Sequence, residues 1–220
     1  MKSLRVVGAI VTAIMLAGLW GCVSRGPGPS RRVAADSPDK INPLGVGQKI
    51  PRVMLRDAAG GAVDLQWNTA RQPTVLLFYR GGWCPFCTRH LAAIGQTQPR
   101  LAKMGYQILA ISPDRPSELA KSSEKGKLGY TLLSDSNMSA ARAFGLAFRV
   151  DDETVDLYKS KYKIDLEASS GRKHHELPVP AAYIIDTSGT IRSRYVNPDY
   201  KTRIDPDKLL AEAKAALKTK

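Results

Sequence analysis

Apolar and polar positions along the chain predict strands and helices in alternation. Residues 74–79 and 106–111 are apolar runs of strand length, which is typical of strands buried on both faces. Between these runs, Leu91, Ile94 and Leu101 recur at helical spacing. This order predicts a β-α-β unit at the centre of the fold.

The flanking segments extend the alternation. Short strands over residues 51–56 and 62–65 would form a hairpin, and residues 181–186 and 190–195 would form another across a turn at 187–189. Helices are expected over residues 117–127, 138–144 and 205–218, with a strand over 130–133. The prediction is an α/β fold with a central mixed sheet flanked by helices and an N-terminal β-hairpin extension.

Residues 151–176 interrupt this order. They contain a possible helix over 153–162 and a polar stretch over 168–176 that resembles an exposed loop. Such an insertion either shapes a substrate cleft or is simply surface, and its residues favour neither interpretation.

The first forty residues differ from the rest. Lys2 and Arg5 precede an uncharged apolar run, the pattern of an export signal, and this run is short for a stable transmembrane helix. The junction Gly21-Cys22 is similar to a bacterial lipoprotein signal, although Trp20 departs from that pattern. We therefore expect a signal over 1–22 with lipidation at Cys22, a flexible linker rich in Gly, Pro and Ser over 23–42, and a redox domain over 43–220. The expected location is the cell envelope, with the protein held by lipid on the membrane and facing the periplasm or exterior.

Composition excludes two classes of protein. The formal net charge is +13, but the basic residues are scattered and no nucleic-acid-binding motif accompanies them, so we expect no nucleic-acid partner. Three cysteines are too few for a disulfide-stapled domain. Their positions therefore matter more than their number.

Cys84 and Cys87 are separated by two residues and stand between a predicted strand and a predicted helix. A thiol attacks as thiolate, and the N-terminus of a helix stabilises that anion. Pro85 suits the first helical position, and Arg80 adds a possible cationic partner. This spacing predicts a redox pair that cycles between dithiol and disulfide without a cofactor.

A metal site is the alternative for the same cysteines. Cys84 and Cys87 with His90 and either His174 or His175 could supply four zinc ligands. A copper site would use the two cysteines and either His174 or His175. No second cysteine pair exists, and Thr88 replaces the histidine of a haem-attachment motif. The favoured prediction therefore contains no metal.

Several ordered motifs carry a resemblance to a known family. Residues 78–87 (FYRGGWCPFC), 44–51, 110–114, 132–135, 177–186 and 195–200 resemble the alkyl hydroperoxide reductase/thiol-specific antioxidant (AhpC/TSA) family, in its peroxiredoxin-like branch, over about residues 43–217. The resemblance implies a thioredoxin fold and a thiol-dependent redox enzyme acting on peroxides or disulfides. It also implies a thiol reductant such as a thioredoxin-like protein. A protein-disulfide reductase of the cell envelope remains an alternative.

The resemblance leaves the attacking thiol open. Trp83-Cys84 matches thioredoxin-like reductases, in which Cys84 would attack and Cys87 would resolve. The peroxiredoxin register instead places Arg80 at a proline, Cys84 at a threonine and Cys87 at the attacking cysteine. Pro180 stands where peroxiredoxins carry an arginine, and it resembles the cis-proline of thioredoxins. We therefore expect Pro180 to be cis and to pack against the dithiol.

Overall fold

The computed structural model describes residues 33–218. The predicted export signal, the lipidation site Cys22 and the first half of the predicted linker lie outside the described residues. Within residues 33–218, no helix is both long enough and apolar enough to cross a bilayer.

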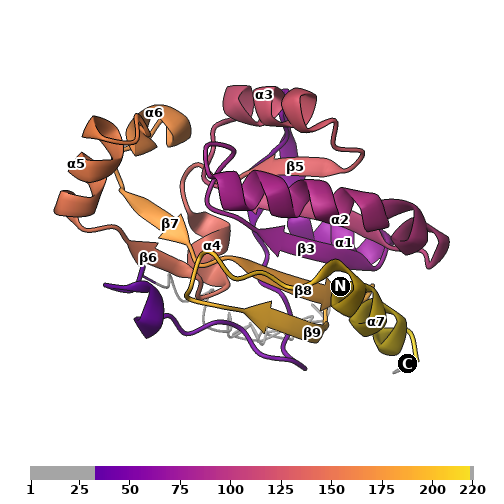
Figure 1. Cartoon of the computed structure of the whole chain (residues 1–220). Helices are drawn as coiled ribbons and strands as arrows, with labels where there is room; N and C mark the ends of the chain where they lie inside the picture. The colour runs from indigo at the N-terminus through magenta and orange to yellow at the C-terminus, as the bar shows by residue number, and fades with distance from the viewer. Residues whose placement is uncertain (1–32, 219–220) are drawn as a thin grey trace, which may run out of the picture.

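A seven-stranded sheet forms the centre of the domain, in the order β2-β1-β5-β4-β3-β8-β9 (Figure 1). Its strands are β1 (Met54–Arg56), β2 (Ala62–Asp64), β3 (Thr74–Phe78), β4 (Gln107–Ser112), β5 (Thr131–Ser134), β8 (Ala181–Ile185) and β9 (Ile191–Val196). Strands β3, β4 and β5 run parallel, whereas β8 pairs antiparallel with β3 and β9 with β8. The predicted mixed sheet and both predicted hairpins are confirmed.

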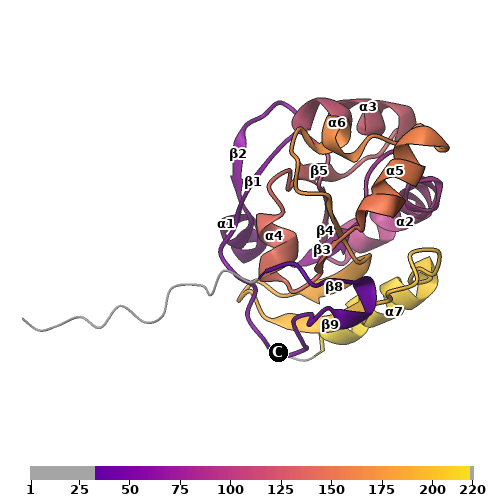
Figure 2. The same cartoon turned by 90° about the vertical axis from the view of Figure 1, so that its left-hand side faces the viewer.

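Helices cover both faces of this sheet (Figures 1 and 2). One face carries α2 (Pro85–Lys103), α3 (Pro116–Gly126) and α7 (Pro206–Ala216), and the other carries α1 (Leu65–Arg71) and α4 (Ser139–Ala143). Alternate residues of β3 point to opposite faces, so Leu77 packs with Leu91 of α2 while Phe78 packs with Phe144 at the end of α4. Burial of each such side chain contributes roughly 1.5–3 kcal/mol, and β3 is buried along its whole length.

The insertion contains more structure than its polar sequence indicates. It comprises α5 (Asp152–Ser160) and α6 (Leu166–Ser170). The strands β6 (Ala147–Arg149) and β7 (Glu176–Pro178) flank it and pair antiparallel. The predicted helix is confirmed as α5. The predicted loop is wrong at both ends, because α6 occupies its start and β7 its end. Strands β6 and β7 have three residues each and lie on either side of the insertion, so neither shows a local periodicity from which a strand could be predicted.

Two further predictions need correction. The described end of the predicted flexible linker is structured: Ala35 forms backbone hydrogen bonds of 2.9 Å to Ala147 and 2.8 Å to Arg149, and residues Pro38–Lys40 form a 3-10 turn. Ala35 pairs with the edge of strand β6, more than one hundred positions later in the chain, so the local composition does not predict this contact. The predicted strand over 62–65 ends one residue earlier, because the Asp64 carboxylate caps helix α1 by accepting from the amide of Trp67.

Candidate active site around the dithiol

The dithiol lies at the N-terminus of α2, as the order of the predicted elements indicates. Cys84 is the N-cap residue with φ −87°, Pro85 follows at the first helical position, and Cys87 lies in the first turn. Both cysteines are free thiols. The central strand β3 and the loop of residues 80–83 hold them at one end of the sheet.

The loop before the dithiol is tightly constrained. A Cβ on Gly81, which has φ +147°, would come within 2.3 Å of Nε1 of Trp83. A Cβ on Gly82 would come within 2.0 Å of the Ser122 hydroxyl oxygen. The amide of Gly82 also donates a 2.7 Å hydrogen bond to the buried carboxylate of Asp114. Gly81 is therefore required by its φ and by the Trp83 ring, a side chain at Gly82 would displace the Ser122 hydroxyl, and Asp114 anchors the loop.

The two sulfur atoms differ electrostatically. The pKa of Cys84 is lowered to about 6, first by a hydrogen bond from the Cys87 thiol and then by the backbone amides of Cys87 and Phe86 and the charge of Arg80, against the opposing effect of burial. The pKa of Cys87 is raised, first by its hydrogen bond to Cys84 and then by burial. Cys84 is therefore the thiolate of the pair and Cys87 its hydrogen-bond donor.

Arg80 is buried beside the dithiol, with only 4% of its surface exposed. One terminal nitrogen donates to the hydroxyl oxygen of Tyr158, and the guanidinium carbon lies 4.3 Å from the ring centroid of Tyr200 and 5.3 Å from that of Trp83. Its Nε–H has no hydrogen-bond partner among residues 33–218, and no ion pair described there includes Arg80. A cation without a neutralising carboxylate can act fully on the neighbouring thiolate.

A second arginine faces the other sulfur. A terminal nitrogen of Arg203 lies 3.5 Å from Sγ of Cys87, and the charge of Arg203 opposes the rise in the pKa of that thiol. The site residues predicted from the sequence did not include Arg203, Tyr158 or Tyr200. Residues 195–200 contributed to the family resemblance, but nothing local linked them to the cysteines.

Pro180 lies close to Arg80, although one hundred positions separate them in sequence. Both line a cavity of about 230 Å³ together with Tyr158, Tyr200 and Val150. The predicted cis bond is wrong, because residues 33–218 contain no cis peptide bond. The trans preference of a proline bond is only about 0.5–1 kcal/mol, so the sequence around Pro180 cannot determine its isomer.

A larger cavity of about 720 Å³ opens between α2 and α3. Trp83 and Pro85, which flank Cys84, line it together with Asp114 and Lys121. The residues around Cys84 therefore border an open space, although Cys84 itself is only 2% exposed.

The candidate metal-ligating histidines are engaged elsewhere. His90 contacts the carbonyl of Ile204, and burial followed by the charge of Arg203 lowers its pKa to about 4. His174 lies within 3.0 Å of the carbonyl of Ser136 and accepts from the amide of Glu176. Within residues 33–218, no three His, Cys, Asp or Glu side chains are grouped as metal ligands. The proposed zinc or copper set is therefore not assembled in the described part of the chain.

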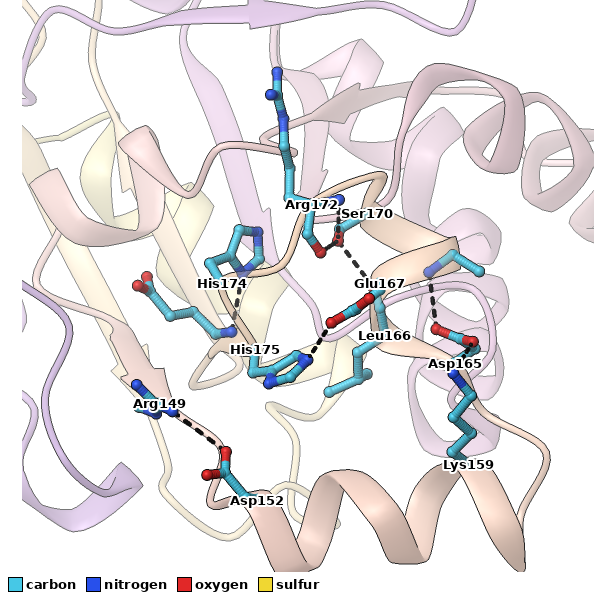
Figure 3. A network of polar contacts seen from close by, with 12 residues as sticks. Arg149, Asp152, Lys159, Asp165, Leu166, Glu167, Ser170, Arg172, His174 and His175 are labelled. Carbon is cyan, nitrogen blue, oxygen red and sulfur yellow. Dashed lines mark hydrogen bonds and ion pairs between the residues drawn. The ribbon is translucent and has the colours of Figure 1, made fainter.

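Polar contacts join the elements of the insertion (Figure 3). His175 lies 2.9 Å from the Glu167 carboxylate, and Lys159 lies 3.0 Å from that of Asp165. Exposed pairs contribute little, typically below about 1 kcal/mol, so the apolar contacts beneath them matter more. Trp83 and Tyr158 pack there against a small cluster of buried residues, Val150, Leu166 and Leu177. The insertion thus lies against the loop that precedes the dithiol.

Comparisons with known proteins agree with this geometry. The family model described as "AhpC/TSA family" matches residues 46–194. Peroxiredoxin Bcp of Escherichia coli (strain K12) is 33% identical over 106 residues, which cover 48% of this chain and 67% of that protein. The chloroplastic peroxiredoxin Q of Gentiana triflora is 28% identical over 151 residues, covering 69% of this chain and 58% of that protein.

Solved structures show the same fold. Peroxidoxin BcpB from Mycobacterium tuberculosis has a TM-score of 0.61 at 22% identity, covering 78% of this chain and 97% of that one. Peroxiredoxin Q from Xanthomonas campestris has a TM-score of 0.57 at 19% identity, covering 74% and 90%. Because the family match spans residues 46–194, this chain belongs to the AhpC/TSA family, as a thiol-dependent oxidoreductase of the peroxiredoxin-like branch of the thioredoxin fold.

Proposed function

We propose that this protein reduces peroxides, with Cys84 as the attacking thiolate and Cys87 as the resolving thiol. The observation that carries the proposal is the pair of free thiols at the N-terminus of α2, with Arg80 beside Cys84 and Arg203 beside Cys87. A thiolate at a helix N-terminus next to a cation is both populated at neutral pH and nucleophilic.

The reaction has two chemical steps. The Cys84 thiolate attacks one peroxide oxygen, the O–O bond breaks, and the leaving oxygen takes a proton to depart as water or an alcohol. Cys84 is then a sulfenic acid. The sulfur of Cys87 attacks the sulfur of Cys84, an S–S bond forms, and the hydroxyl departs with the Cys87 proton as water. The two thiols have supplied two electrons to the peroxide.

Burial favours a small oxidant. Cys84 and Cys87 are 2% and 1% exposed, so the disulfide of a folded protein would not reach either sulfur without movement of the loop. A peroxide is small enough to enter through the cavity that borders Trp83 and Pro85. A thiol reductant must then reduce the Cys84–Cys87 disulfide back to the dithiol, and we propose a thioredoxin-like protein for this step. It would act once the disulfide becomes accessible.

A stopped-flow comparison tests the proposal. We expect hydrogen peroxide to oxidise the reduced protein with loss of two thiols for each peroxide consumed, and faster than a protein disulfide does at equal concentration. Cys84→Ser should abolish the reaction, whereas Cys87→Ser should stop at a sulfenic acid that a dimedone probe labels. Faster oxidation by the protein disulfide would instead support a protein-disulfide reductase.

We also propose export to the cell envelope with a lipid anchor at Cys22. The support is the charged start, the apolar run and the Gly21-Cys22 junction. Intact mass of protein from the membrane fraction should correspond to a mature chain beginning at a lipidated Cys22. Cys22→Ser should release the protein from that fraction, and a mature chain that begins elsewhere would contradict the proposal.

A further inference from the structure

Helix α5 of the insertion contributes a side chain to the surroundings of the dithiol. Tyr158 accepts a hydrogen bond from a terminal nitrogen of Arg80, and its ring lies 5.6 Å from the guanidinium carbon and 6.1 Å from the ring of Trp83. Thr154, one turn earlier on the same side of α5, lines the same cavity as Tyr158 and Arg80. The insertion therefore forms a wall of the site.

Arg80 has few other directional contacts. Among the described residues its Nε–H is unpartnered and no carboxylate pairs with it, while the rings of Trp83, Tyr158 and Tyr200 surround its guanidinium. Aromatic faces attract a cation but do not determine its orientation as closely as a hydrogen bond does. In the described part of the chain, the hydrogen bond to the Tyr158 hydroxyl is the polar contact that orients this buried charge.

We propose that Tyr158 is a positioning residue, supplied by the inserted helix, which holds the Arg80 guanidinium toward Cys84 and so maintains Cys84 as a reactive thiolate. The insertion is thereby a working part of the redox site. This inference rests on the proposed function only in taking Cys84 as the attacking thiol.

Other charged and titratable groups also surround the sulfurs. Cys87 hydrogen-bonds Cys84 from within α2, Arg203 approaches Cys87 from the segment before α7, and Tyr79 at the end of β3 interacts with Cys87. The charge of Asp114, which follows β4, helps to raise the pKa of Tyr79. The hydrogen bonds and ring contacts described for the Tyr158 side chain involve Arg80, Trp83 and Tyr162 and none of these groups, so we expect removal of its hydroxyl to act on Cys84 through Arg80.

The test measures the reactivity of Cys84 alone. In a background with Cys22→Ser and Cys87→Ser, the pH dependence of alkylation by iodoacetamide reports the pKa of Cys84. Tyr158→Phe keeps the ring and removes the hydroxyl oxygen that accepts from Arg80. We expect the midpoint to rise by about half a pH unit to one unit, because an adjacent cation lowers a thiol pKa by roughly 1–3 units and only part of that effect is lost. Starting from about 6, a one-unit rise lowers the thiolate fraction at pH 6 about fivefold.

The chain offers a matched control. Tyr162 follows Tyr158 by one turn, its ring lies 6.3 Å from that of Tyr158, and it is 54% exposed. Tyr162→Phe should leave the midpoint unchanged. Arg80→Met should raise the midpoint by about one unit or more. Tyr158→Phe should then add no further shift in the Arg80→Met protein.

Three results would overturn the inference: an unchanged midpoint in Tyr158→Phe, an equal shift in Tyr162→Phe, or a Tyr158→Phe shift that persists in the Arg80→Met protein. Thermal unfolding of each variant identifies loss of folding, which Tyr158→Phe should not cause because the ring remains. The alkylation assay contains no peroxide. If peroxide reduction fails while the Tyr158–Arg80 dependence holds, the proposed function is wrong and the positioning role remains.

Discussion

The identity of the thiolate is the prediction on which the mechanism depends. In a Cys22→Ser background, Cys87→Ser leaves only Cys84 and Cys84→Ser leaves only Cys87. The hydrogen bond from the side chain at position 87 is the largest influence on the pKa of Cys84, and a serine hydroxyl can still donate it. We expect the protein that retains Cys84 to react faster with iodoacetamide at pH 6.5.

The expected size of the difference follows from two opposing effects. With a pKa of about 6, Cys84 is about three-quarters thiolate at pH 6.5, whereas an ordinary cysteine of pKa near 8.5 is about 1% thiolate. Intrinsic nucleophilicity falls with pKa, and a Brønsted slope of about 0.4–0.5 offsets roughly tenfold of that advantage. The net gain is therefore about four- to eightfold over an ordinary cysteine. It is larger over Cys87, because burial still raises the pKa of that thiol when Cys84 is replaced.

Rates measured from pH 5 to 9 separate charge from access. Because both cysteines are almost fully buried, restricted access should slow both variants at every pH, whereas thiolate stabilisation shifts the midpoint only in the protein that retains Cys84. The rates should become equal in denaturant. Cys87→Ala, which lacks any donor to Cys84, should have a higher midpoint than Cys87→Ser. A faster reaction of the protein that retains Cys87 would refute this reasoning and assign the attack to Cys87.

Three further perturbations test the surroundings of the dithiol. Gly82→Ala should lower the free energy of unfolding by about 1–3 kcal/mol in urea denaturation, because the new methyl would lie 2.0 Å from the Ser122 hydroxyl oxygen; unchanged stability would contradict that contact. Burial raises the pKa of Asp114 to about 6, above its unfolded value, so the stability contributed by this group is present at low pH and is lost as the pH rises through 6. Between pH 4 and pH 7 the free energy of unfolding, measured in urea, should therefore fall by about 2–3 kcal/mol less in Asp114→Asn than in the wild type. An equal fall in both proteins would contradict the raised pKa. Arg203→Met should raise the pKa of Cys87 further in the protein that retains only this thiol, measured by alkylation, whereas a fall would show that Arg203 does not act on it.

Strong local patterns made most of the fold predictable. The apolar run at β3 and the helical spacing of α2 each identify an element from its own residues, because burial on two faces or on one stripe imposes that pattern. The insertion shows the limit. Strands β6 and β7 contain three residues each and find their partner across α5 and α6, so their pairing depends on contacts that no local window contains.

The candidate site divides in the same way. The sequence by itself determined the dithiol and its place at the start of a helix, since strand, loop and N-cap are adjacent in the chain. Only the tertiary structure brought Tyr158 and Tyr200 to Arg80 and Arg203 to Cys87. It also placed Pro180 in a trans peptide beside Arg80. Tyr158 comes from α5, Tyr200 and Arg203 come from the loop between β9 and α7, and Pro180 directly precedes β8. Their meeting follows from the packing of α5 and of the segment before α7 against one end of the sheet, and that packing depends on the whole core rather than on any local pattern of residues.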